Sequence, residues 1–554
     1  MASTSEKRGL PGLLDAIERL GNALPDPTTL FFLGALLVLL LSQLAASFEW
    51  TVEKTISREV REDVLDSAGG PVVDPATGEP ITRAVLDAVT GQPKRERVQV
   101  PVRATGLLSS EGLYWVLRSM VTNFTGFPPL GVVLVGMLGI GVAERSGLIG
   151  AALKAVLLAV PATLLTPTIF FVGVMSSLGL DAGYVVLPPV AAALYVAAGR
   201  SPLVGIAAVF AGVSAGFSAN LFITSLDPLL AEFSTAGARL IDPDYAVAAT
   251  ANWWFMIASS VLLTTVGWAV TAWWVEPRFQ GKPAEEGGAA PLAPEALASQ
   301  RLSPQEQRGL VAAAGAAGLA LVVFAAAAWI PGAPLDGLDG PFPRWVRVIV
   351  PLIFLGFLVP GLVYGVVTGS VRSDRDVARI MGEVMAGMGP YVVLAFFAAQ
   401  FIAYFAHSGL GEMMAIAGGQ ALARAALPTA VLMVGFIAVV MVSNLFIGSM
   451  SAKYAFFAPV FVPMFMQVGV SPELTQVAYR VGDSVTNVIT PLNPYVVILL
   501  VYMQRYVPRA GIGTLVALML PYTVVFALAW TALLVVWIGA GVALGPAGPL
   551  SYAP

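Results

Sequence analysis

The chain has 554 residues, of which 57% are hydrophobic and only 12% are charged, a balance that predicts a membrane protein. A formal net charge of −4 at pH 7 gives no footprint for nucleic acid, whose binding needs clustered Lys and Arg. Because the chain has no Cys and a single His, a disulfide framework, a thiolate metal site and a His-based zinc site are all excluded.

Long apolar stretches divide the chain into nine predicted membrane spans. Residues 1–27 lack an apolar run closed by a cleavage site, so they predict a cytoplasmic N-terminus. Each apolar stretch is long enough to cross a hydrocarbon core of roughly 30 Å. The predicted spans are 28–48, 127–144, 203–235, 249–275, 307–329, 346–368, 389–406, 473–503 and 511–540. Residues 307–368 thus contain two of these spans. Residues 49–126 predict an extracytoplasmic insertion with a β-rich lobe and an interfacial segment, and residues 276–306 predict a cytoplasmic linker.

Two further apolar regions, 160–198 and 427–468, are too long for one crossing and are interrupted midway by polar residues. Each predicts a re-entrant hairpin, which is tolerated where its tip is buried in protein or lines an aqueous cavity. The basic residues of the short loops 276–306, 369–388 and 504–511 predict that these loops are cytoplasmic. The chain is therefore expected to pass several times through a membrane, with these loops on the cytoplasmic side.

The chain contains an internal repeat. Residues 146–148 recur at 408–410, residues 181–184 match 451–454 at an offset of 270, and residues 224–228 match 490–494 at an offset of 266. The predicted topology makes the first copy (127–235) start inward and the second (389–503) start outward. Antiparallel copies are typical of secondary transporters, whose sites lie where interrupted helices meet.

The spans 203–235 and 473–503 are each interrupted near the centre by Gly, Pro and polar residues. Carbonyls freed by unwinding, together with Asn, Ser and Asp oxygens, can coordinate Na⁺, and the N-terminus of a half-helix favours an anion. A kink used only for packing is the alternative. The ion-coupling candidates are Asp483, Asn444, Asn487, Asp181 and Asn220, with Na⁺ expected at Asn444, Asp483 and Asn487.

Charged and aromatic residues give candidates for substrate binding. Arg480 and Asp483 lie three apart on one helix, so we expect them to pair, as a structural pair or a functional one. The guanidinium of Arg480 can hold a carboxylate, and Asp483 can take up a proton or a cation. Asp181 and Ser451 occupy equivalent hairpin tips, the second close to Tyr454. Outside the site, Gln400 is expected to hydrogen-bond between helices.

The runs at 216–221, 224–228, 479–484 and 490–494 resemble the AbgT family of bacterial transporters. The resemblance implies a homodimer in which each protomer has an elevator-like core of hairpins and broken helices beside a scaffold. It also implies ion-driven uptake of para-aminobenzoyl-glutamate or export of sulfonamide antimetabolites. The family pattern is matched by Asp181, Ser451, Arg480, Asp483, Pro472 and Pro491, whereas Tyr454 stands where the family usually has Trp. The ring of Tyr454 is expected to pack on the aryl ring of the substrate. The substrate-binding candidates are Arg480, Tyr454, Ser451, Asp181, Asn220, Pro472 and Pro491. The resemblance also implies a multi-pass protein of the bacterial inner (cytoplasmic) membrane.

The sequence thus predicts an all-α polytopic membrane protein with inverted repeats, about nine membrane helices and two re-entrant hairpins. The expected function is ion-coupled transport of an anionic aryl substrate through a lipid bilayer. No cofactor is expected other than a coupling Na⁺ or H⁺, and no nucleic acid partner. A carrier of simple dicarboxylates is one alternative; a membrane-embedded enzyme using Asp181 and Asp483 as an acid/base pair is a remote one.

Overall fold

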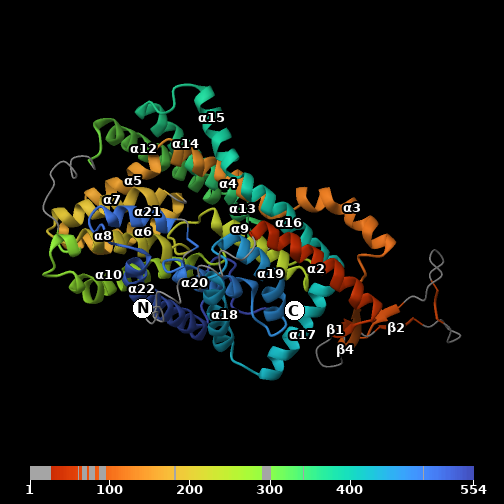
Figure 1. The fold of residues 1–554 in the computed structure, drawn as a ribbon. Helices are drawn as coiled ribbons and strands as arrows, with labels where there is room; N and C mark the ends of the chain where they lie inside the picture. The colour runs from red at the N-terminus through yellow and green to blue at the C-terminus, as the bar shows by residue number, and fades with distance from the viewer. Residues whose placement is uncertain are drawn as a thin grey trace, which may run out of the picture.

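The computed structural model describes residues 26–59, 61–64, 71–73, 82–85, 95–179, 182–289, 301–340, 342–490, 492–493 and 495–553. Two predicted site residues, Asp181 and Pro491, lie outside the described residues, as do parts of the predicted segments 1–27, 49–126 and 276–306. Helices dominate the described chain (Figure 1), which confirms the predicted fold class.

Within the described residues, seven helical segments are long and apolar enough to cross a membrane, and each overlaps one of the predicted continuous spans. The remaining two predicted spans, 203–235 and 473–503, are broken into shorter helices. The seven segments are α2 (Pro27–Ser47), α3 (Ser110–Thr125) with α4 (Pro128–Arg145), α10 (Trp253–Val270) with the turns η4 (Thr271–Val275) and η5 (Glu276–Arg278), α12 (Pro304–Trp329), α14 (Ile349–Thr368), α16 (Gly389–His407) and α22 (Ile512–Ala540).

Local sequence explains where several of these helices begin. Asp26 caps α2 by accepting from the backbone N–H of Thr28 at 2.8 Å, and Pro27 follows at the first helical position. Ser303 and Glu306 form a reciprocal capping box at the start of α12. Both devices satisfy backbone N–H groups that have no partner within the helix.

The first repeat contains a hairpin and a broken helix. Its elements are α4, α5 (Leu148–Leu158), η1 (Ala162–Leu164), α6 (Leu165–Met175), η2 (Ser176–Gly179), α7 (Ala182–Ala197), α8 (Pro202–Phe210), the π-helical turn η3 (Ala211–Ala215) and α9 (Leu226–Ala238). Residues 216–225, between η3 and α9, are not helical.

The second repeat has the same order of elements. They are α16, α17 (Leu410–Ala425), α18 (Thr429–Asn444), α19 (Met450–Met466), α20 (Pro472–Thr486) and α21 (Tyr495–Gln504). The first two helices join in the same way in both repeats, because Gly147 and Gly409 adopt φ values of +95° and +75°. Glycine takes this left-handed conformation without steric cost.

The hairpins pack on the broken helices of both repeats. Within the second repeat α18 packs along α20, within the first α7 packs along α8, and α19 lies against α9 of the first repeat. Beside this region α14 packs on both α4 and α12. Segments far apart in sequence, α9, α19 and α20, therefore come together in the middle of the molecule (Figure 1).

The remaining elements are short and lie at the periphery. They are β1 (Thr51–Glu59), β2 (Arg61–Asp63), β3 (Thr82–Ala84), β4 (Arg95–Arg103), η6 (Ala284–Glu286), β5 (Leu338–Asp339), β6 (Phe342–Pro343), α13 (Arg344–Arg347) and α15 (Asp374–Gly387). Strands β1 and β4 form an antiparallel ribbon with Thr51 opposite Arg103, and β2 pairs with β3 and β5 with β6 in the same sense. The ribbon projects from the helical body (Figure 1).

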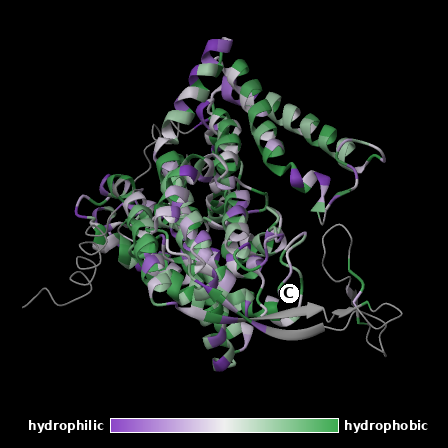
Figure 2. Ribbon diagram, turned by 90° about the vertical axis from the view of Figure 1, so that its right-hand side faces the viewer, coloured by the Kyte–Doolittle hydropathy of each residue, from purple (hydrophilic) through white to green (hydrophobic). Residues whose placement is uncertain are grey.

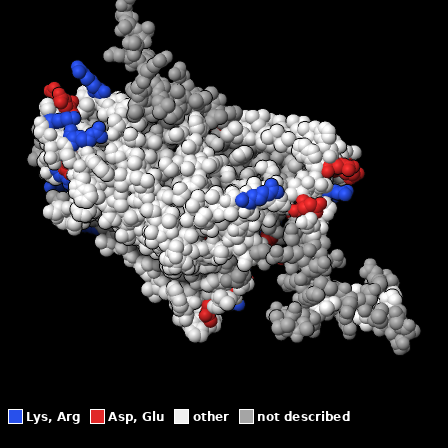
Figure 3. Space-filling view, turned by 90° about the horizontal axis from the view of Figure 1, so that it is seen from below, with Lys and Arg blue, Asp and Glu red and all other residues white. Residues whose placement is uncertain are grey.

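The surface agrees with a membrane environment. Apolar residues dominate the helices in Figure 2. Lys, Arg, Asp and Glu are few on the face shown in Figure 3, and most of the described surface in that view carries other residues. Inside the protein, Gln400 accepts from Asn123 at 3.0 Å and donates to the carbonyl of Met120, which confirms its predicted role between helices.

Candidate functional site

The two helix breaks touch each other. Ser214, in the last turn before the first break, accepts from both amides of the second break. The Nδ2 of Asn487 donates to its carbonyl at 3.4 Å, and the Nδ2 of Asn493 donates to its hydroxyl at 3.3 Å. The predicted convergence of the two breaks is therefore present in the structure.

Asn444 joins the second hairpin to the second broken helix. It ends α18, is fully buried, and its Nδ2 lies 2.7 Å from the carbonyl oxygen of Asp483 and 2.8 Å from the Oδ1 of Asn487. The same nitrogen lies 2.9 Å from the hydroxyl of Thr486. The structure thus brings together Asn444, Asp483 and Asn487, the three residues predicted to hold Na⁺.

A buried lysine sits among these residues. The Nζ of Lys453, on α19, lies 2.7 Å from the Oδ1 of Asp483 and donates to the Oδ1 of Asn444. The Lys453 and Asp483 side chains are 0% and 1% exposed, and the Oδ2 of Asp483 has no hydrogen-bond partner among the described residues. Sequence reasoning gave Lys453 no role. The sequence alone could have identified Lys453 as a candidate, because an ionisable residue within an apolar hairpin marks a functional position.

The predicted pairing of Arg480 with Asp483 is wrong. Arg480 instead forms a buried ion pair with Asp227 in the first turn of α9. Three residues along an α-helix correspond to about 300° of rotation, so two such side chains point about 60° apart. Because α20 is surrounded on all sides, that divergence directs Arg480 to α9 and Asp483 to the second hairpin.

Asp227 is held in place by its own helix start. Its Oδ2 accepts from the backbone N–H of Thr224 at 2.6 Å and from the hydroxyl of Thr224 at 2.9 Å, which leaves Oδ1 for Arg480. The Nε of Arg480 is buried without a partner among the described residues. Sequence analysis placed Asp227 in the break but did not assign it as a site residue.

Tyr454 is buried between three helices. Its hydroxyl lies 2.6 Å from the Oγ of Ser234 on α9, which in turn donates to the Oε1 of Gln476 at 2.8 Å. The ring lies 4.3 Å from the ring of Tyr479 on α20. In this conformation the aromatic ring predicted to stack on substrate is packed inside the protein.

The other predicted residues lie farther from the Asn444 group. Asn220 donates to the hydroxyl of Ser177 at 2.8 Å, so it joins the first broken helix to the first hairpin. Ser451 is partly exposed on the second hairpin, with its Oγ 3.5 Å from the Oγ of Ser449. Pro472 begins α20, about 12 Å along the helix axis from Arg480, and is therefore not brought into contact with that side chain.

The start of α20 is fixed by the loop after α9. The hydroxyl of Tyr245 donates to the carboxylate of Glu473 at 3.0 Å. Burial raises the pKa of the Tyr245 hydroxyl, and the neighbouring Glu473 carboxylate raises it further. Tyr245 therefore stays protonated and keeps this bond at neutral pH.

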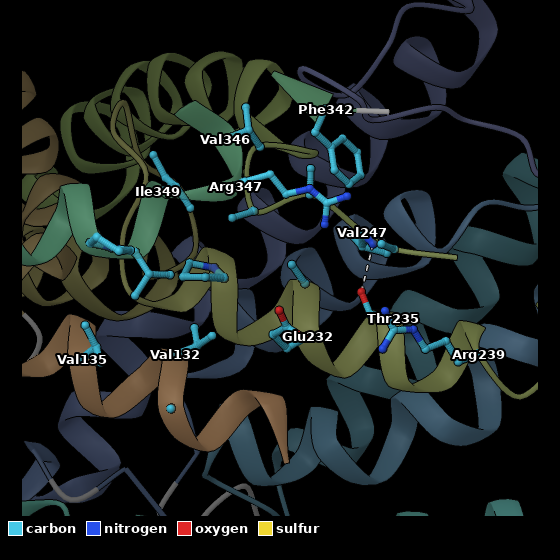
Figure 4. Close-up of a pocket in the computed structure, with 18 residues that line it drawn as sticks. Val132, Val135, Glu232, Thr235, Arg239, Val247, Phe342, Val346, Arg347 and Ile349 are labelled. Carbon is cyan, nitrogen blue, oxygen red and sulfur yellow. Dashed lines mark hydrogen bonds between the residues drawn. The ribbon is translucent and has the colours of Figure 1, made fainter. Parts of the chain in front are cut away.

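A pocket of about 400 Å³ lies beside α9, and Pro228, the residue after Asp227 in sequence, is one of its walls. Figure 4 shows Glu232 and Arg239 of α9 on one side of this pocket and Phe342 and Arg347 on the other. Much of its apolar lining comes from valine and isoleucine side chains: Val132, Val135, Val247, Val346, Ile349 and Val350. The pocket combines an apolar wall with two guanidinium groups and one carboxylate.

Comparison with known proteins agrees with this architecture. The "p-aminobenzoyl-glutamate transport protein" of Escherichia coli strain K12 is 35% identical over 479 residues, covering 84% of this chain and 91% of that protein. The YdaH transporter of Alcanivorax borkumensis is 39% identical with a TM-score of 0.79, covering 94% of this chain and all of that one. MtrF of Neisseria gonorrhoeae, from "a class of antimetabolite efflux pumps", is 38% identical with a TM-score of 0.81, covering 95% and 97%.

The family match spans almost the whole sequence. A model described as "AbgT putative transporter family" matches residues 12–552, which include both repeats and every helix described above. The relatives are named as transporters, which points to transport rather than catalysis. The chain belongs to the AbgT family of membrane transporters.

Proposed function

We propose that this chain is an ion-coupled secondary transporter of para-aminobenzoyl-glutamate-like aryl dicarboxylates, or an exporter of sulfonamide antimetabolites. It works by alternating access of a core made of the hairpins and broken helices, driven by Na⁺ or H⁺. We further propose that it acts as a homodimer in a bacterial inner membrane. The names of the relatives from Escherichia coli and Neisseria gonorrhoeae support the substrate classes.

One observation carries the proposal: two buried ion pairs lie on the same broken helix and face different elements. Arg480 pairs with α9, and Asp483 pairs with the second hairpin. Burying a charge is costly unless it is paired, so neither partner can be lost without a replacement. A substrate carboxylate can replace Asp227 at Arg480, and a coupling cation can occupy Asp483. Loading of both ligands then changes which elements α20 holds.

The pocket in Figure 4 suits the approach of an amphipathic aryl anion. Its apolar wall and the ring of Phe342 can cover an aromatic ring, and the guanidinium groups of Arg239 and Arg347 can attract carboxylate or sulfonamide oxygens. The pocket and the Arg480 pair share α9, since Pro228 lines the pocket and Asp227 precedes it in the first turn of that helix.

The test is flux into proteoliposomes. Labelled para-aminobenzoyl-glutamate and a labelled sulfonamide are supplied under separately imposed Na⁺ and proton gradients. We expect gradient-dependent movement of at least one of them, lost in Arg480→Gln. Movement of neither substrate under either gradient would refute the substrate assignment.

A carrier of simple dicarboxylates is the alternative, since polar breaks and a buried Arg also suit succinate. Excess succinate is therefore added to the same assay. Strong inhibition of aryl-substrate flux by succinate, together with uptake of labelled succinate, would favour that alternative. The aryl assignment predicts weak inhibition, because succinate cannot fill the apolar part of the pocket.

A further inference from the structure

The ammonium group of Lys453 occupies the position of a bound cation. It contacts one carboxylate oxygen, Asp483 Oδ1 at 2.7 Å, and one amide oxygen, Asn444 Oδ1. The amide nitrogen of Asn444 points to the end of α20, so its oxygen faces the lysine. Carboxylate and amide oxygens are the ligands that hard cations such as Na⁺ use in proteins.

The charges in this group already cancel. One ammonium faces one carboxylate, and both side chains are completely buried. The hydroxyl of Tyr479 lies 3.4 Å from the Oδ1 of Asp483. It donates to the carbonyl of Met450 and adds no formal charge. A free cation bound at Asp483 beside Lys453 would leave a net positive charge in a low-dielectric interior, which is strongly unfavourable. Lys453 and a free cation therefore compete for Asp483.

The positions equivalent to this pair carry no charge in the first repeat. Lys453 aligns with Gly183 at the repeat offset of 270, and Asp483 aligns with Phe217 at the offset of 266. Yet a polar contact between hairpin and broken helix is present in both repeats, through Ser177 in the first and Asn444 in the second. The hairpin can be held on the broken helix without charges, so the ion pair has a purpose other than packing.

Resting on the proposed ion coupling, we propose that Lys453 is a tethered cation that holds Asp483 when no coupling ion is bound and leaves it when the ion binds. Lys453 lies on the second hairpin, whose neighbouring residue Tyr454 bonds to Ser234 of α9. Release of the ammonium therefore removes the ionic contact between the hairpin and α20. Ion binding and hairpin movement become one event, and Lys453 acts as a positioning residue for that step.

Competition is tested by Na⁺ binding to the purified full-length protein. The midpoint of thermal unfolding is followed against Na⁺ concentration, with choline keeping the ionic strength constant. Lys453→Met should bind Na⁺ at least tenfold more tightly than wild type, because its Asp483 lacks a competing charge. Lys453→Arg should resemble wild type, and Lys453→Met combined with Asp483→Asn should lose the Na⁺ response. The matched control is Lys154→Met, which removes a half-buried lysine whose ammonium donates to the carbonyl of Arg301.

A second measurement keeps Lys453 in place and so does not depend on the stability of Lys453→Met. The chain has no Cys, so Ser451→Cys gives a single thiol on the second hairpin. If Na⁺ displaces Lys453, saturating Na⁺ should change the rate of maleimide labelling at least threefold, and Asp483→Asn should abolish the change. An unchanged Na⁺ affinity in Lys453→Met, or a labelling rate indifferent to Na⁺, overturns the proposal.

Both measurements report binding without transport. Absent flux in proteoliposomes would refute the proposed function and leave the competition at Asp483 standing. Gradient-driven flux combined with unchanged Na⁺ affinity in Lys453→Met would refute the competition at Asp483 and leave the proposed function standing.

Discussion

Replacing Asp227 by Asn should destabilise the folded protein by about 3–5 kcal/mol, the usual cost of removing one partner from a buried ion pair. Arg480 is 2% exposed and Asp227 is 9% exposed, so water cannot replace the lost carboxylate. The two Asp227 oxygens face donors on opposite sides, Arg480 and the N–H and hydroxyl of Thr224. The amide of Asn must point its NH₂ group at one of these donors, whichever way it is turned.

The assay is unfolding of the purified protein by SDS in mixed micelles, followed by Trp fluorescence. Asp244→Asn, at an exposed position, is the matched control and should stay within about 0.5 kcal/mol of wild type. Arg480→Gln and the double variant complete a cycle, in which the coupling between the two sites should reach about 2 kcal/mol or more. Additive single effects, or a cost below about 1 kcal/mol for Asp227→Asn, would refute the ion-pair reasoning.

Two further predictions concern the hairpin and the repeat turns. Tyr454→Phe keeps the buried ring and loses one hydrogen bond to α9, so it should cost about 1 kcal/mol in the same unfolding assay; a cost above about 3 kcal/mol would contradict this account. Gly409→Ala should lower the thermal midpoint more than Gly147→Ala. Both substitutions place a β-carbon on a residue in the left-handed conformation, which costs about 1–2 kcal/mol. A β-carbon at 409 would also lie 3.0 Å from a backbone oxygen, whereas one at 147 meets only a ring carbon at 3.5 Å.

The spans and the repeat could be predicted from the sequence because each rests on a local property. Apolar length decides whether a helix can cross a membrane, and the seven long segments follow that rule. The repeated Ser-Gly-Leu sequence marks the same turn in both copies, because glycine is needed there for a positive φ. Clusters of Gly, Pro and polar residues predicted the positions of both helix breaks.

The pairing of charges could not be predicted in this way. The rule that residues three apart on a helix interact joined Arg480 to Asp483, but it applies to exposed helix surfaces. On a buried helix, tertiary partners decide, and the partner of Arg480 comes from 253 residues away. Lys453 escaped notice because its partner also comes from another element.

The two repeats reveal which contacts hold the fold and which handle charge. At the offset of 266, Arg480 aligns with Ser214 and Asn493 aligns with Asp227, so the contacts Arg480–Asp227 and Ser214–Asn493 join equivalent positions. A neutral hydrogen bond suffices at one of them, hence charge is not required to dock the broken helices.

The double variant Arg480→Gln with Asp227→Asn should therefore fold, elute as wild type does and regain much of the stability lost in either single variant. It should nevertheless lose gradient-driven flux, because a neutral pair has no charge to exchange with an anionic substrate. Flux at the wild-type rate in this variant would show that the ion pair serves packing alone. A double variant less stable than both single variants would instead show that the neutral Ser214–Asn493 contact cannot be reproduced at the Arg480–Asp227 position. The two positions would then be equivalent only in their backbone geometry.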